Sequence, residues 1–256
     1  MKRRLLSTIA ALATTFVLFT GCSAVSTDAA TTTTVATATA AAATVTTDSS
    51  ATSSDFDWDS LPSTEVTLTD KGLTITEAGT YILSGSTTGQ IVVDTDGDVR
   101  IILNGVTIAS STGAAIQVNN ADNTVIELAE GTTNKVSDAA TRSDESIDAA
   151  IYSADDLFIT GEGTLTFTAS FADGIAGKDD LTIESGTINV TSADDGVTGK
   201  DSLVVTGGTL TVDAAQDGLK ATNDADAGEG QLVIAGGTVT ITSGDQAIKG
   251  SSQLRV

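Results

Sequence analysis

The stretch from Asp173 to Ile183 reads Asp-Gly-Ile-Ala-Gly-Lys-Asp-Asp-Leu-Thr-Ile, and residues 195–205 repeat it as Asp-Gly-Val-Thr-Gly-Lys-Asp-Ser-Leu-Val-Val. Related copies recur at intervals of 22 to 29 residues and align one apolar residue each: Ile151, Ile175, Val197, Leu219 and Ile248. Ile116 opens an earlier copy. A short internal repeat of this kind is typical of a solenoid, in which each copy is one stacked structural unit.

Each copy contains three short apolar segments. The Asp-Gly-Ile segment is followed by an alternating strand such as Leu181–Ile183, and then by a second strand introduced by Gly-Thr, such as Ile188–Val190. Alternation with a period of two sends one face inward. One copy is too small to form a core, but stacking copies at about 4.8 Å joins them into continuous apolar ladders. Because equivalent positions recur in the same sense, the sequence predicts an all-β fold, a right-handed parallel β-helix with three short strands per rung.

The last residues of the sequence, Gln253-Leu254-Arg255-Val256, correspond to Asp180–Ile183, which lie partway through a rung. Terminal rungs normally need a polar cap, because an open parallel edge invites pairing with other chains. We therefore expect the β-helix to be truncated at its C-terminus, with its cap in residues beyond this sequence.

The N-terminal residues have the layout of an export signal. Basic residues at positions 2–4 precede the mostly apolar stretch Leu5–Phe19, which is too short for a permanent membrane span. Phe19-Thr20-Gly21-Cys22 resembles a bacterial lipobox, although the lipobox pattern prefers Leu at position 19. We predict a lipoprotein-type signal peptide over residues 1–21 and lipidation of Cys22. The exported protein would then sit at the cell surface, joined to the outer face of the membrane by this lipid only. The alternative is an ordinary signal peptide with an incidental cysteine.

Composition separates a tether from a folded body. Residues 22–55 are mostly Ser, Thr, Ala and Val and predict a flexible tether, which leaves the β-helix domain over residues 56–256. The full chain has a net charge of −22, and removing residues 1–21, which hold three basic residues and no acidic one, makes it −25. Such a charge excludes nucleic acid as a partner. The chain has no histidine, which removes the commonest general base and the usual zinc ligand.

Three motifs resemble those of a family of bacterial surface carbohydrate-binding proteins. They are Gly-Thr-Tyr-Ile-Leu-Ser-Gly at residues 79–85, Asn-Gly-Val-Thr-Ile at residues 104–108, and the repeated stretch at residues 173–183. The resemblance covers roughly residues 65–256. It implies a pectate-lyase-like β-helix that contains calcium, binds acidic plant polysaccharide or cellulose, and has no evident lyase activity. The domain at residues 56–256 would then be a carbohydrate-binding domain.

Acidic residues recur at two points of successive rungs, six residues apart. In a stacked fold they form two columns, with Asp194 beside the first. Two carboxylates one rung apart repel by about 1 kcal/mol in bulk water and by about 3–4 kcal/mol at an effective dielectric constant near 20. A cation between them would remove this repulsion, and Ca²⁺ prefers carboxylate and carbonyl oxygens. We therefore predict a Ca²⁺ cofactor held by Asp173, Asp179, Asp194, Asp195, Asp201, Asp217 and Asn223. The alternative is that these are solvated turn residues, since Asp is a preferred residue in turns.

Three residues are candidates for contact with sugar. Lys178 and Lys200 occupy matching positions beside the second acidic column, and Phe171 lies in a rung with two extra residues. The lysines could bind sugar carboxylates or hydroxyls, and Phe171 could stack on a sugar ring. The alternatives are that the lysines balance the charges of Asp179 and Asp201, and that Phe171 is a buried filler.

The sequence favours a non-catalytic protein of the cell surface that uses calcium to bind acidic polysaccharide similar to polygalacturonate, or cellulose. One alternative is a calcium-dependent polysaccharide lyase, in which Lys178 or Lys200 would be the base. Neighbouring carboxylates raise the pKa of a lysine, which works against that role. A second alternative is a surface-structural or adhesive protein that binds no particular glycan.

Overall fold

The computed structural model describes residues 36–39 and 51–256. The predicted signal peptide, Cys22 and most of the predicted tether lie outside these residues. The described chain is all-β, apart from two single-turn 3₁₀ helices, η1 (Ser53–Asp55) and η2 (Trp58–Ser60). Within this part of the chain, no helix has the length and apolarity needed to cross a membrane.

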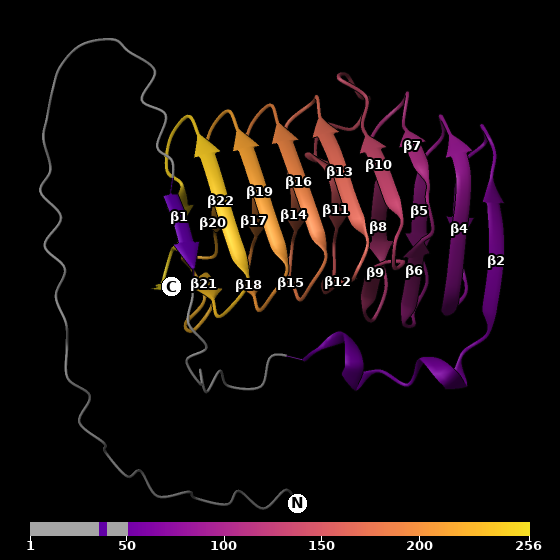
Figure 1. The fold of residues 1–256 in the computed structure, drawn as a ribbon, viewed down its shortest axis with the longest axis horizontal. Helices are drawn as coiled ribbons and strands as arrows, with labels where there is room; N and C mark the ends of the chain where they lie inside the picture. Colours follow the sequence, from indigo (N-terminus) through magenta and orange to yellow (C-terminus); the bar gives the residue numbers. More distant parts are fainter. Residues whose placement is uncertain (1–35, 40–50) are drawn as a thin grey trace, which may run out of the picture. The chain divides into compact units, whose positions relative to one another are not determined.

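The strands form three faces, which we name A, B and C (Figure 1). Face A contains β7 (Thr107–Ala109), β10 (Thr133–Ser137), β13 (Thr164–Ala169), β16 (Thr187–Ser192), β19 (Thr209–Ala214) and β22 (Thr238–Ser243). Face B contains β2 (Ser63–Leu68), β6 (Val99–Leu103), β9 (Thr124–Leu128), β12 (Leu157–Gly161), β15 (Asp180–Ile183), β18 (Ser202–Val205), β21 (Gln231–Ile234) and β24 (Gln253–Arg255). Face C contains β3 (Leu73–Ile75), β5 (Ile91–Asp94), β8 (Ile116–Asn120), β11 (Ala149–Ser153), β14 (Asp173–Gly177), β17 (Val197–Gly199), β20 (Leu219–Ala221) and β23 (Ile248–Lys249).

Strand β4 (Gly79–Thr87) belongs to two faces. Its residues 79–85 pair with β2 and β6 on face B, and its last two residues pair with β7 on face A. Gly85 is the last residue on face B, directly before the turn to face A, and its φ is +82°, a conformation that glycine adopts without steric cost. The short strand β1 (Ala36–Thr39) runs antiparallel to β22, and every other pairing among the described strands is parallel.

The core consists of apolar ladders that run from rung to rung, which confirms the predicted parallel β-helix. The repeated apolar residues pair in register on face C, in the order Ile116, Ile151, Ile175, Val197, Leu219 and Ile248. All of these except Ile248 are fully buried. Period-two alternation places their neighbours in sequence on the outside of the face, where functional side chains can project.

A loop of residues 138–148 interrupts the repeat between β10 and β11. Arg142 holds this loop closed, because it forms a buried ion pair with Asp138 and donates a hydrogen bond to the carbonyl of Ala149 (3.1 Å). Asp148, the last residue of the loop, lies directly before β11. The loop therefore carries an acidic side chain to the edge of face C.

Residues 51–62, which we name the strap, cross the outer side of face B before the chain enters β2 (Figure 1). The backbone N–H of Ser53 donates a hydrogen bond to Glu184 Oε1 (2.7 Å), and Phe56 packs edge-on against Phe158 with 5.4 Å between ring centroids. At the other end, the Pro62 carbonyl accepts a hydrogen bond from Thr80. The composition of residues 51–55 predicts part of the tether, whereas the structure packs this end of the strap against the folded body.

Two glycines of β14 test how tightly the rungs pack. A Cβ atom at Gly174 would lie 2.3 Å from the Gly196 carbonyl oxygen and 2.6 Å from Val190 Cγ1. At Gly177 the nearest atom would be Leu181 Cβ, at 3.2 Å. We expect Gly174→Ala to lower the free energy of unfolding by about 1–3 kcal/mol, the usual cost of overpacking. Gly177→Ala is the matched control and should cost less in urea denaturation; equal losses would contradict this packing.

Candidate functional site

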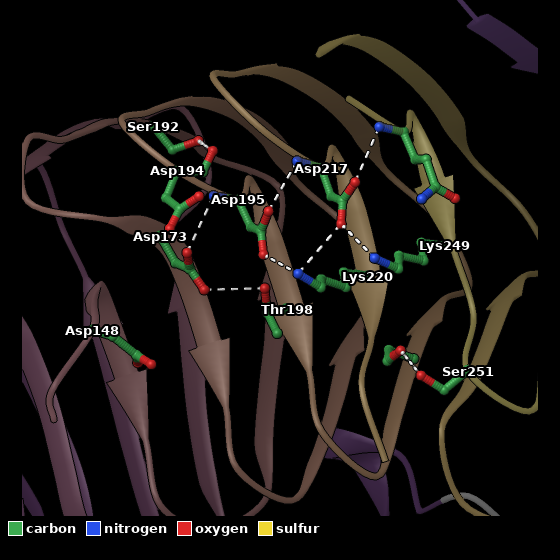
Figure 2. Close-up of polar contacts among 12 residues, drawn as sticks. Asp148, Asp173, Ser192, Asp194, Asp195, Thr198, Asp217, Lys220, Lys249 and Ser251 are labelled. Atoms are coloured by element: carbon green, nitrogen blue, oxygen red, sulfur yellow. Dashed lines mark hydrogen bonds and ion pairs between the residues drawn. The ribbon is translucent and has the colours of Figure 1, made fainter. Parts of the chain in front are cut away.

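The first acidic column lies where the strands of face C begin. Asp173 is the first residue of β14, and Asp195 and Asp217 each lie two residues before the strand of the next rung. Each carboxylate accepts a backbone hydrogen bond from the following rung: Asp173 from Asp195 (3.1 Å), Asp195 from Asp217 (2.9 Å) and Asp217 from Gln246 (3.0 Å) (Figure 2). All three aspartates are buried. The column therefore has a structural role, since its hydrogen bonds join each rung to the next.

Lysines balance the second and third aspartates of this column. Lys220 Nζ lies 2.7 Å from Asp195 Oδ2 and 3.3 Å from Asp217 Oδ2, and Lys249 Nζ lies 3.3 Å from Asp217 Oδ2. In register, Lys220 occupies the outward position that Thr198 has one rung earlier and Ala176 two rungs earlier. The lysine contacts of this column thus begin at Asp195, one rung after Asp173.

Asp173 lacks a lysine partner among the described residues and lies instead among other acids. Its Oδ2 accepts a hydrogen bond from the Thr198 hydroxyl (3.1 Å). Carboxylate oxygens of Asp173, Asp194 and Asp195 all lie within 4.8 Å of one another. Burial, together with the negative charges of Asp195 and Asp148, raises the pKa of Asp173 to about 7. Partial loss of solvent contact and the negative charge of Asp195 also raise the pKa of Asp194, although its side chain stays exposed. This cluster holds more negative charge than its surroundings balance.

The chemistry of this donor set fits Ca²⁺, which binds carboxylate oxygens and supplies positive charge. The ion would be held by Asp173, Asp194 and Asp195. It would balance the negative charge of Asp173, as Lys220 balances that of Asp195. Asp194 is exposed, so the cluster is open to solvent. In Figure 2 its carboxylate points toward Asp173, and Asp148 lies on the same side of the column.

The second acidic column lies at the other end of the same strands. Asp179, Asp201 and Asn223 each follow a strand of face C by two residues. A strand advances about 3.3 Å per residue, so aspartates six residues apart cannot bind the same ion. Here Asn223 donates a hydrogen bond to Asp201 (2.7 Å), and Lys200 lies 3.1 Å from Asp201. Burial and the charge of Asp156 raise the pKa of Asp179. An amide and a lysine balance Asp201, which makes this column the weaker candidate for calcium.

The three side chains predicted to contact sugar already contact other residues of the protein. Lys178 Nζ lies 2.9 Å from Asp148 Oδ2 and 5.6 Å from the centroid of the Tyr152 ring. The partner of Lys178 is therefore Asp148, and not Asp179, which the charge-balance alternative predicts. Lys200 pairs with Asp201, as that alternative predicts. The Arg142 guanidinium carbon lies 4.2 Å from the centroid of the half-buried Phe171 ring, so one face of this ring is covered.

The structure adds Tyr152 to the site, which sequence reasoning missed. Tyr152 is the outward neighbour of Ile151 and pairs in register with Ala176, beside the acidic cluster. It is half-exposed. The alternation of β11 already indicates an outward aromatic ring at this position. The contact of Lys220 with Asp195 has a weaker signal in the sequence. The only indication is that Lys220 follows Asp217, the aspartate of its own rung, by three residues.

Comparisons with known proteins agree with this architecture. Residues 69–256 match the family described as carbohydrate-binding domain-containing protein, and the chain belongs to this family. A carbohydrate-binding domain-containing protein of Acetivibrio thermocellus is 36% identical over 146 residues, which are 53% of this chain and 51% of the relative. The chain thus spans about half the length of this curated relative. A solved structure of a polysaccharide lyase-like protein from C. thermocellum, a gadolinium derivative, is 29% identical with a TM-score of 0.69, and the match covers 74% of this chain and 89% of that one.

The raised pKa of Asp173 makes the stability of the metal-free protein depend on pH. The folded state keeps this proton up to about pH 7, whereas the unfolded chain loses it near the ordinary value of 3.8. The folded state therefore binds the proton more tightly, and the free energy of unfolding falls as pH rises from about 4 to 7. The expected fall is on the order of 4 kcal/mol, from about 1.4 kcal/mol for each unit of pKa. Thermal unfolding in excess chelator should show it as a falling Tm.

Asp173→Asn separates this effect from other titrations. The variant loses the titrating group and keeps an oxygen that can accept the hydrogen bond from Asp195. Its Tm should vary less over this pH range, and above about pH 7 the metal-free variant should be more stable than the parent. Parallel curves for the two proteins would show that Asp173 does not carry the pH dependence.

Proposed function

We propose that the protein is a non-catalytic carbohydrate-binding protein of the cell surface, which binds acidic polysaccharide such as polygalacturonate with the help of Ca²⁺. One observation carries the proposal. The oxygens of Asp173, Asp194 and Asp195 converge within 4.8 Å on a solvent-accessible edge, at the one step of the column that has no lysine among the described residues. Membership of a carbohydrate-binding family supports the sugar as ligand.

The net charge of the protein makes a cation necessary for such a ligand. A chain at −22 repels a polyanion at long range. A divalent ion shared between the protein carboxylates and the uronate carboxylates converts this repulsion into attraction. The ion would also balance Asp173, so binding and local stability are linked.

The surface next to the cluster can contact sugar directly. Tyr152, one rung before Asp173 in face C, presents a half-exposed ring on which a sugar can stack. Two lysines near the cluster already pair with carboxylates, Lys178 with Asp148 and Lys220 with Asp195. They can donate to sugar hydroxyls or uronate oxygens while keeping those partners, since an ammonium group has three donors.

The electrostatics of the lysines support binding without catalysis. A lyase base must be unprotonated near neutral pH, which requires a lysine of strongly lowered pKa. The hydrogen bond and charge of Asp201 raise the pKa of Lys200. Burial opposes the same change at Lys220, but the bonds and charges of Asp195 and Asp217 outweigh it and raise the pKa. Both groups stay protonated and would act as donors.

The proposed location rests on the N-terminal sequence, which lies outside the described residues. A signal peptide over residues 1–21 and a lipid on Cys22 would hold the carbohydrate-binding domain at the outer face of the membrane. Such an anchor suits a protein that captures polymer outside the cell.

Affinity electrophoresis through polygalacturonate tests the calcium-assisted binding. We expect retardation of the protein with Ca²⁺ and none in excess chelator. Asp194→Asn should abolish most of the calcium-dependent retardation, because it removes one candidate ligand whose carboxylate accepts no hydrogen bond within the described chain. Asp213→Asn, which removes the same charge from an exposed position on face A, is the matched control and should behave as the parent. Retardation that persists in chelator would rule out the calcium bridge.

Lyase activity, which we expect the protein to lack, can be measured separately. Incubation with polygalacturonate and Ca²⁺ should give no increase in the ultraviolet absorbance of unsaturated uronide products. A clear increase that Lys178→Ala or Lys220→Ala abolishes would instead establish a lyase.

A further inference from the structure

A groove between the strap and face B lies apart from the acidic cluster on face C. Its volume is about 430 Å³, which falls within the roughly 300–1,000 Å³ of typical ligand-binding clefts. Trp58 of the strap forms one wall, and its floor and far side include Arg100, Glu127, Thr160 and Glu162. The groove combines an aromatic ring with charged donors and acceptors.

The floor of the groove is built by strand register. Arg100 pairs with Val125, and Glu127 pairs with Thr160, so these four residues project outward from β6, β9 and β12 as two adjacent columns. Arg100 Nε donates a hydrogen bond to Glu127 Oε2 (2.7 Å). Both side chains are about one-quarter exposed, at 27% and 26%, so each can still reach a ligand. The ion pair fixes the positions of the two groups before anything binds.

The wall of the groove is a tryptophan held in place by its neighbours. Trp58 Nε1 donates a hydrogen bond to the Ser53 carbonyl (3.0 Å), and the Phe56 ring packs edge-on against it at 5.6 Å. Phe56 in turn packs against Phe158 of β12. The polar atom of the indole is therefore satisfied within the strap, and the half-exposed ring offers an apolar surface to the groove.

The chemistry of the groove selects a neutral sugar. An arginine only donates hydrogen bonds and a carboxylate only accepts them, whereas a sugar hydroxyl does both. Neighbouring hydroxyls of one pyranose ring can therefore bond to Arg100 and Glu127 while the ring stacks on Trp58. Glu127 and the exposed Glu162 outnumber Arg100, so a uronate carboxylate would be repelled. We propose that this groove is a second, calcium-independent site, which binds a neutral oligosaccharide.

Trp58 is the only tryptophan of the chain, so its fluorescence reports on the groove alone. Titration with neutral hexasaccharides of glucose, xylose or mannose in excess chelator should give a saturable change in emission for at least one of them. Hexagalacturonate should give none. No saturable change with any neutral hexasaccharide would overturn the proposal, and a response to hexagalacturonate in its place would overturn the choice of a neutral ligand.

Two variants separate this site from the calcium cluster. Glu127→Gln should weaken binding of the neutral hexasaccharide at least tenfold by calorimetry and leave calcium-dependent retention on polygalacturonate unchanged. Asp173→Asn should do the reverse. The emission maximum of Trp58 before titration shows whether the strap stays docked in Glu127→Gln. Equal hexasaccharide affinity in Glu127→Gln and the parent would overturn the assignment of the groove, whatever the outcome at the calcium cluster.

Discussion

The whole structure depends on parallel, in-register stacking of equivalent residues. Each residue of a rung has its counterparts about 4.8 Å above and below, so any property of one position is repeated along the axis. For Ile151, Ile175 and Val197 this repetition produces a fully buried apolar ladder from rungs that could not form a core alone. For aspartates the same repetition brings like charges together, and the chain must compensate for this at every step.

The first acidic column shows three forms of compensation at equivalent positions. Every aspartate accepts a hydrogen bond from a backbone N–H of the next rung. Asp195 and Asp217 also contact Lys220, while Asp173 has Thr198 in the place of that lysine. A single difference in register, Thr198 in place of a lysine, therefore distinguishes the part of the column that lysines balance from the cluster that we propose binds a cation. The candidate site of this solenoid thus lies where one residue departs from the repeat.

The same distinction explains what sequence alone could predict. The rungs, the parallel pairing and the two acidic columns follow from spacing, because the repeat itself carries them. The pairing of Lys178 with Asp148 does not, since Asp148 lies in the loop at residues 138–148, outside the repeat. The strap was missed for a related reason. Its residues show no period, and Ser53 meets Glu184 across a separation of 131 residues. Contacts of this kind become visible only when the stack is assembled.

The course of the strap has a mechanical consequence. A force applied upstream of β1 first loads the pairing of β1 with β22. Once that pairing is lost, the load enters the body beside Glu184, several rungs away from β2, where the β-helix begins. The Ser53–Glu184 hydrogen bond and the Phe56–Phe158 contact lie along the stacking axis ahead of β2 and must slide apart together before the load reaches that strand. Contacts loaded in shear share the force, whereas an edge strand that is peeled breaks one hydrogen bond at a time. The strap therefore protects the first rung from unravelling under tension.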